Sequence, residues 1–113
     1  MDNILLELEK ILEERKLSSI DKSYVSSLYQ EGTNKILEKV SEESDEVIKA
    51  AKDEGREEII HEMADLLFHL LVLLRHKNIS LEEVELELAN RFGISGHEEK
   101  ASRKNKLKNI LTK

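Results

Sequence analysis

The chain has 113 residues, of which 37% are charged and 39% hydrophobic, and it contains no proline, cysteine or tryptophan. This composition favours an all-α domain over a β protein, which needs more turn residues and more β-branched or aromatic residues. A formal net charge of −6 argues against nucleic-acid and membrane-surface partners, and the absence of cysteine excludes disulfides, thiolate metal sites and a cysteine nucleophile.

Two helices are predicted before residue 33. Residues 3–16 carry apolar residues at the spacing of an amphipathic helix, namely Ile4, Leu8, Ile11 and Leu12. This segment has no basic leader followed by an apolar core, so we do not expect a signal peptide. A short second helix is predicted over 24–31, and Gly32 is expected to end it.

Two long helices are predicted in the centre of the chain. Thr33 or Asn34 is expected to cap a helix that ends near Lys52. The short turn "DEG" then leads into a helix from about Arg56 to His76. Such a short connection makes the two helices antiparallel neighbours.

The segment 78–92 predicts one more helix, with Ser80 as its cap and Glu83 in the capping-box position. We expect the Gly- and Lys-rich tail 93–113 to become ordered only against another surface. With no internal repeat or long linker, residues 1–113 are predicted to form a single domain. The fold class predicted is an all-α bundle of four to five helices.

The first central helix has carboxylates along its apolar face. At about 100° per residue, one stripe contains Ile36, Val40, Val47 and Ala51. Glu43 interrupts this stripe and Glu42 and Glu46 flank it, whereas Asp45 points away. Three of the four acids in "SEESDE" therefore lie on or near the buried face.

The second central helix is apolar nearly all round, which is typical of a helix at the centre of a bundle. Its stripe consists of Ile59, Met63, Leu66, Leu67, Leu70 and Leu74. Glu62, Asp65 and His69 share one flank. The apolar run "LLFHLLVLL" at 66–74 is far shorter than the ~20 residues of a membrane span.

Antiparallel packing brings E-E-x-x-E on one helix opposite E-x-x-D on the next. Carboxylates crowded together repel one another and lose hydration, so a cation is needed to stabilise them. Oxygen ligands without cysteine favour Mg²⁺, with Mn²⁺ as a substitute, over zinc. Each motif alone is also common on solvated helix faces. A di-iron bundle needs two E-x-x-H motifs, and the chain offers at most one.

His69 has two possible roles. It is either a core histidine with satisfied polar atoms or a residue that orients the carboxylate of Asp65, four positions earlier. His61 and His76 are expected to lie on the surface.

The strings "SYVSSLYQEGTNKILEKVSEESDEVIKAAK" and "EEIIHEMADLLFHLLVLL" resemble the phosphoribosyl-ATP pyrophosphohydrolase family, which belongs to the all-α MazG-like nucleotide pyrophosphohydrolases. The resemblance runs from about Ser23 to Leu74, and "RFGISGHEEKASRK" at 91–104 is similar to a family tail segment. The usual "GEEA" around the acid pair reads "SEES" here, with Ser41 and Ser44 still small.

The resemblance implies a set of site residues. Glu43, Glu46, Glu62 and Asp65 would be Mg²⁺ ligands. Glu42 would be an additional ligand or the base that activates water, and Glu43 is the other catalytic candidate. Lys39 and Lys52 would face phosphates, although both are also ordinary helix-surface partners. Tyr24 and Leu28 would line the base and ribose pocket unless they belong to the core. The implied substrate-binding set is completed by His69, Lys100 and Arg103.

The resemblance also implies an activity, namely Mg²⁺-dependent hydrolysis of phosphoribosyl-ATP to phosphoribosyl-AMP and pyrophosphate in histidine biosynthesis. It implies a cytoplasmic homodimer or higher homo-oligomer, with the helical core completed across the interface. One alternative is a MazG-like house-cleaning hydrolase of (d)NTPs. Another is a helical adaptor without activity, whose acids only solvate a dimerising bundle.

Overall fold

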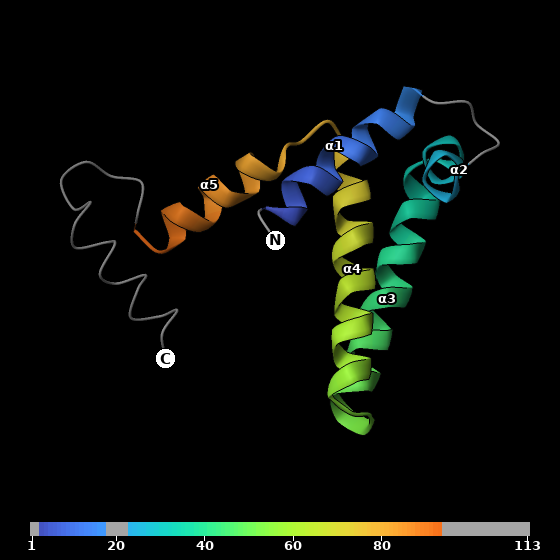
Figure 1. The fold of residues 1–113 in the computed structure, drawn as a ribbon, viewed down its shortest axis with the longest axis vertical. Helices are drawn as coiled ribbons and strands as arrows, with labels where there is room; N and C mark the ends of the chain where they lie inside the picture. Colours follow the sequence, from blue (N-terminus) through green and yellow to red (C-terminus); the bar gives the residue numbers. More distant parts are fainter. Residues whose placement is uncertain (1–2, 18–22, 94–113) are drawn as a thin grey trace. The chain divides into compact units, whose positions relative to one another are not determined.

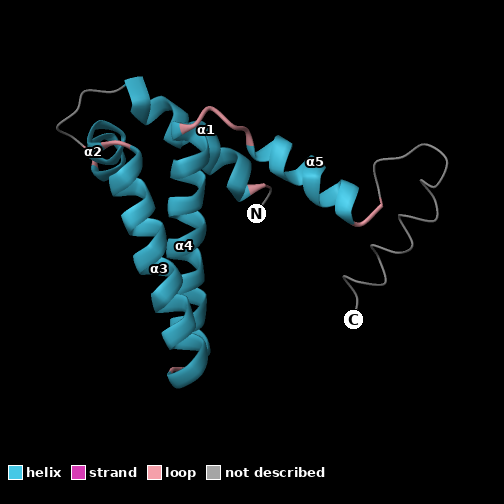
Figure 2. Ribbon diagram, turned by 180° about the vertical axis from the view of Figure 1, so that it is seen from behind, coloured by secondary structure: helices cyan, strands magenta, loops and turns pink. Residues whose placement is uncertain are grey.

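The computed structural model describes residues 3–17 and 23–93, and this part of the chain contains five α-helices and no strands (Figure 1). The helices are α1 Ile4–Leu17, α2 Tyr24–Glu31, α3 Thr33–Asp53, α4 Arg56–His76 and α5 Leu81–Arg91. The prediction of an all-α fold with four to five helices is confirmed, as the uniform helical colouring of Figure 2 makes visible.

The structure divides into two units, residues 1–79 and residues 80–113, which are described separately. In the second unit, the Ser80 hydroxyl accepts a hydrogen bond from the Glu83 backbone at 3.1 Å, and the Glu83 carboxylate accepts one from the Ser80 backbone at 2.9 Å. The predicted capping box is therefore confirmed. The tail at 94–113 lies outside the described residues, and the single-domain assignment stays a prediction.

In the first unit, α3 and α4 form an antiparallel hairpin and run side by side in both views (Figures 1 and 2). Only Glu54 and Gly55 separate the two helices. Gly55 has a φ of −95°, which any residue adopts, so the turn does not depend on the freedom of glycine. The hairpin that the short connection predicted is thus present.

Gly32 joins α2 to α3 and serves both helices. Its backbone N–H donates to the Leu28 carbonyl at 3.0 Å and ends α2, as predicted. Its φ of 92° and ψ of −171° lie in a region that glycine adopts almost exclusively. The expected cap at Thr33 or Asn34 was wrong, because Gly32 itself is the N-cap and α3 begins at Thr33.

Most of the buried core lies where α1 and α2 pack against the hairpin, and Ala50 is buried near the hairpin turn. Its apolar members are Leu12, Val25, Leu28, Ile36, Ala50, Leu71 and Val72. Ala51, predicted in the buried stripe, is exposed, and its neighbour Ala50 is buried instead. Ala50 and Ala51 follow Val47 by three and four residues, so both lie near the edge of the stripe. Packing against α4 buries Ala50.

Polar side chains fasten α1 to the rest of the unit. The Arg75 guanidinium on α4 lies 3.1 Å from the Glu13 carboxylate and 3.7 Å from that of Glu9. Tyr29 donates its hydroxyl to the Leu12 carbonyl at 2.9 Å and stacks on His76. His76 was predicted at the surface, but this stacking and a 3.1 Å contact with the Thr33 hydroxyl leave it partly buried.

In the single chain, one face of α4 remains apolar and exposed. Ile60, Met63 and Leu67 are 58%, 42% and 43% exposed, and with Ile59 and Ala64 they line a shallow apolar groove. None of the helices in the described part of the chain has the length and apolar character of a membrane span.

Candidate functional site

The α4 half of the site consists of three ligand-type side chains, the predicted Glu62 and Asp65 together with His61. His61, Glu62 and Asp65 each offer one nitrogen or oxygen atom, and these atoms lie within 4.8 Å of one another. His61 Nε2 is 3.4 Å from Asp65 Oδ2, one helical turn away. This spacing is close enough for one small cation to bridge the group.

The α3 half of the site faces Glu62 across the hairpin. Partial burial raises the pKa of the Glu62 carboxyl above its ordinary value, and the negative charges of Glu46, Asp65 and Glu43 raise it further. The charge of His61 acts in the opposite direction. The carboxylates of the two helices are thus near enough to repel one another, as the matched distances from the turn predicted.

The two halves do not yet form one close group. Glu43 is half-buried and Glu46 exposed, and neither belongs to the cluster of atoms within 4.8 Å found among the described residues. The carboxylate oxygens of the donor set suit Mg²⁺ or Mn²⁺, whereas the His61 imidazole is a ligand type more typical of zinc and other transition metals. Mutual repulsion at Glu62 is the feature that a bound cation would relieve, so the residues fit such an ion.

Basic and phenolic groups lie beside the α3 carboxylates. Lys39 forms an ion pair with Glu42 at 3.2 Å, one turn along α3. Burial raises the pKa of the Tyr24 hydroxyl, the charge and hydrogen bonding of Lys39 lower it, and Glu43 and Glu42 raise it. Tyr24 on α2 therefore belongs to the electrostatic surroundings of the acid pair.

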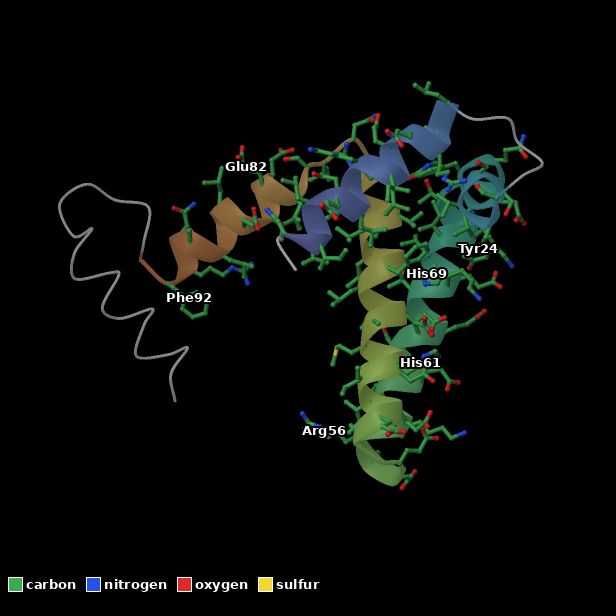
Figure 3. All side chains as sticks on the ribbon, in the orientation of Figure 1. Tyr24, Arg56, His61, His69, Glu82 and Phe92 are labelled. Atoms are coloured by element: carbon green, nitrogen blue, oxygen red, sulfur yellow. The ribbon has the colours of Figure 1, made fainter. Side chains whose placement is uncertain are left out.

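His69 is buried on α4, with only 6% of its surface exposed. Its Nδ1 lies 2.9 Å from the Asp65 backbone carbonyl and its Nε2 lies 2.8 Å from the Tyr24 hydroxyl. The Tyr24 and His69 rings meet edge to face at 5.7 Å (Figure 3). Of its two predicted roles, the structure places His69 in that of a satisfied core histidine, because its ring nitrogens bond to the Asp65 backbone and to Tyr24 rather than to the Asp65 carboxylate.

Similarity to known proteins covers nearly all of the described residues. A sequence model described as phosphoribosyl-ATP pyrophosphohydrolase matches residues 5–92. The chain belongs to this family.

Several curated relatives of the phosphoribosyl-ATP pyrophosphohydrolase family are similar along almost their whole length. The phosphoribosyl-ATP pyrophosphatase of Vesicomyosocius okutanii is 60% identical over 105 residues, which are 93% of this chain and 100% of that protein. The protein of the same name from Ruthia magnifica is 55% identical over the same shares. That of Geobacter metallireducens is 52% identical over 90% of this chain and 94% of its own. The family resemblance seen in the sequence is confirmed.

The other residues implied by the pyrophosphohydrolase family are placed differently. Leu28 is 1% exposed and lies in the core, and Lys52 is exposed in the last turn of α3. Lys100 and Arg103 lie outside the described residues. The Ser44 hydroxyl donates to the Val40 carbonyl at 2.8 Å, so this departure from the family's "GEEA" is satisfied within the helix.

His61 is the site residue that the sequence analysis missed. It was assigned to the surface, and its side chain is indeed 67% exposed, yet it contacts Asp65. Figure 3 shows it on α4 between the labelled Arg56 and His69. The i, i+4 spacing of His61 and Asp65 was the available signal for this contact.

Proposed function

We propose that the chain hydrolyses the α–β phosphoanhydride of phosphoribosyl-ATP and releases phosphoribosyl-AMP and pyrophosphate, the second step of histidine biosynthesis. Family membership supports the substrate, since the relatives that carry this name match over nearly their whole length. The observation that carries the chemistry is the meeting of α3 and α4 carboxylates at Glu62, where burial first and then like charges raise the pKa of the carboxyl.

Glu43, Glu46, Glu62 and Asp65 would hold Mg²⁺, and Mn²⁺ would substitute for it. The close grouping of Glu62 and Asp65 beside His61 supports the α4 part of this assignment. When bound, the cation would neutralise the triphosphate and the charge that develops on the leaving pyrophosphate. This neutralisation also answers how a protein with net charge −6 accepts an anionic nucleotide.

The chain's own side chains would supply proton transfer and phosphate binding. Glu42 or Glu43 would accept a proton from the attacking water, whose oxygen forms the new bond to phosphorus as the bridging P–O bond breaks. The ammonium of Lys39, which lies beside Glu42, would face the phosphates. The remaining proposed substrate contacts are Tyr24, Lys52, Lys100 and Arg103, because Leu28 and His69 are buried in the core.

We further propose a homodimer or higher homo-oligomer in the cytoplasm. The exposed apolar groove along α4 supports self-association, because apolar surface of this kind is stabilised when a second copy covers it. The absence of cysteine is compatible with a reducing compartment.

Pyrophosphate release from phosphoribosyl-ATP and from a panel of NTPs and dNTPs, with and without Mg²⁺, tests the proposed activity. We expect phosphoribosyl-ATP to be the preferred substrate, EDTA to stop the reaction and Mg²⁺ to restore it. Preference for a dNTP would identify a house-cleaning hydrolase instead. Activity in the presence of chelator would refute the proposed metal dependence.

A helical adaptor would hydrolyse none of these nucleotides, and its melting temperature would not respond to low concentrations of Mg²⁺. Thermal melts with Mg²⁺ therefore complement the assay. A Mg²⁺-dependent rise in the melting temperature is expected for the proposed enzyme.

A further inference from the structure

The contacts of His69 determine which of its nitrogens carries the proton. A backbone carbonyl can only accept hydrogen bonds, and the Asp65 carbonyl lies 2.9 Å from His69 Nδ1. The carbonyl has two lone pairs, so this bond is compatible with the i, i+4 helical bond to the same oxygen. His69 Nδ1 must therefore be the donor nitrogen of this pair.

The direction of the Tyr24 hydrogen bond follows from this assignment. In a neutral imidazole that carries its proton on Nδ1, Nε2 has only a lone pair to offer. The Tyr24 hydroxyl, 2.8 Å away, must donate its one hydrogen to Nε2. The phenol oxygen then presents only lone pairs to other neighbours, so it can accept from an ammonium but cannot donate to a phosphate.

Lys39 is the cationic neighbour of this oxygen. Its ammonium has three N–H groups, and one of them reaches Glu42 at 3.2 Å. Tyr24 is 49% exposed, so its hydroxyl lies at the edge of the core where the α3 side chains are accessible. Burial raises the pKa of the Tyr24 hydroxyl, and the charge and hydrogen bonding of Lys39 lower it, so the two groups are electrostatic neighbours.

We propose that His69 and Tyr24 are positioning residues that hold the Lys39 ammonium beside Glu42 and Glu43, ready for the substrate's phosphates. Hydrogen bonds thus link the main chain of α4 to the α2 tyrosine, and the Lys39 side chain on α3 interacts with that tyrosine and with Glu42. This inference rests on the proposed function for the role of Lys39, but the direction of the bonds does not.

The tautomer of His69 is measurable in the unmodified protein without substrate. Nitrogen-15 NMR of histidine-labelled protein distinguishes the two neutral tautomers, and the exposed His61 serves as an internal reference. We expect His69 to carry its proton on Nδ1. A proton on Nε2 would reverse the Tyr24 bond and overturn the inference.

Kinetics of Tyr24→Phe, Lys39→Met and the double variant test the role of the pair. We expect Tyr24→Phe to lower kcat/KM about tenfold, the order of one hydrogen bond to a charged group, with the change mainly in KM. In the Lys39→Met background the same tyrosine change should have no further effect. Equal effects of Tyr24→Phe in both backgrounds would overturn the proposal, because Tyr24 would then act independently of Lys39.

Tyr29→Phe is the matched control. It also removes a partly buried hydrogen bond, but the partners of Tyr29 are the Leu12 carbonyl and the His76 ring, which lie outside the proposed site. It should leave KM unchanged. If the unsubstituted protein does not hydrolyse phosphoribosyl-ATP, the proposed function is wrong. The NMR measurement of the His69 tautomer still tests the direction of the hydrogen bonds, because it does not depend on activity.

Discussion

The Glu62 carboxyl is surrounded by like charges, and this has a consequence for stability. Its pKa is raised above the ordinary value of 4.5, first by burial and then by Glu46, Asp65 and Glu43. The folded chain therefore binds a proton at Glu62 more readily than the unfolded chain does. The resulting contribution to the free energy of unfolding is complete below pH 4.5 and is lost as pH rises through the raised pKa.

Replacing Glu62 with glutamine should stabilise the metal-free protein at pH 7, because it removes the charge that its neighbours repel. The same change should abolish stabilisation by Mg²⁺, which for a binding-competent site amounts to about 2.7 kcal/mol at 100 times Kd. Thermal melts with and without Mg²⁺ measure both effects. Asp45→Asn, at an exposed acid of the same helical hairpin, is the control and should leave the Mg²⁺ response intact. A lower melting temperature of metal-free Glu62→Gln would contradict this account.

Glu43→Gln and Asp65→Asn are each expected to abolish turnover while leaving the helical fold intact. Loss of an outer partner of a metal ligand typically costs 10- to 100-fold, so loss of a ligand should reduce kcat/KM by more than about a hundredfold. Pyrophosphate release and circular dichroism of the same samples are the measurements. Retained activity in either variant would show that the ligands have been assigned wrongly.

Residue spacing was sufficient to predict that Glu43, Glu46, Glu62 and Asp65 lie at matching levels of the hairpin. Residue spacing was not sufficient to predict which side chains His61 and His69 contact. His69 was a candidate for the Asp65 carboxylate, but its ring reaches the Asp65 backbone and Tyr24 instead. His61 was assigned to solvent and yet contacts that carboxylate. Side-chain direction, which the pattern of residue types does not contain, decides both cases.

At the scale of the elements, the two glycine connections differ in what they require. Gly32 has a φ of 92°, whereas Gly55 has a φ of −95°, and a methyl group added at either position would meet no neighbour. Only the backbone conformation therefore distinguishes them. Gly32 also sets the angle between the helix that carries Tyr24 and the helix that carries Glu43.

Gly32→Ala should destabilise the protein by about 1–3 kcal/mol, the usual cost of a non-glycine residue in such a conformation. Gly55→Ala is the matched control. It should be neutral or stabilise by about 0.4–1 kcal/mol, because alanine restricts the unfolded chain. Urea unfolding of the two variants gives the comparison, and equal effects would contradict the assignment of strain to Gly32.

The helix boundaries were largely predictable because the apolar periodicity, Gly32 and the Ser80 capping box are local features. The start of α3 was predicted wrongly, since Thr33 is a good cap by type but the chain turns at Gly32 before it. The apolar pattern also could not predict which of Ala50 and Ala51 is buried. Packing against another helix, rather than local preference, decides which of two neighbouring alanines is buried.

At the scale of the whole molecule, the α4 groove predicts how the chain associates. Met63→Glu places a charge at its centre and should weaken the proposed homodimer, shifting the protein toward a monomer at micromolar concentration. Light scattering coupled to size exclusion measures the mass. Leu17→Glu, at a leucine that is exposed outside this groove, is the control and should leave the mass unchanged. An unchanged dimer in Met63→Glu would place the interface elsewhere.

The connection through Glu54 and Gly55 also bears on how the chain folds. Contacts between segments close in sequence form early, so α3 and α4 are expected to pair before more distant contacts are made. Pairing brings Glu43 and Glu46 toward Glu62 at that stage, and their repulsion then opposes the folding transition state as well as the native state. A divalent cation should therefore speed refolding in stopped-flow experiments and not only slow unfolding. On this view the proposed catalytic ion is also a participant in the kinetics by which the hairpin forms.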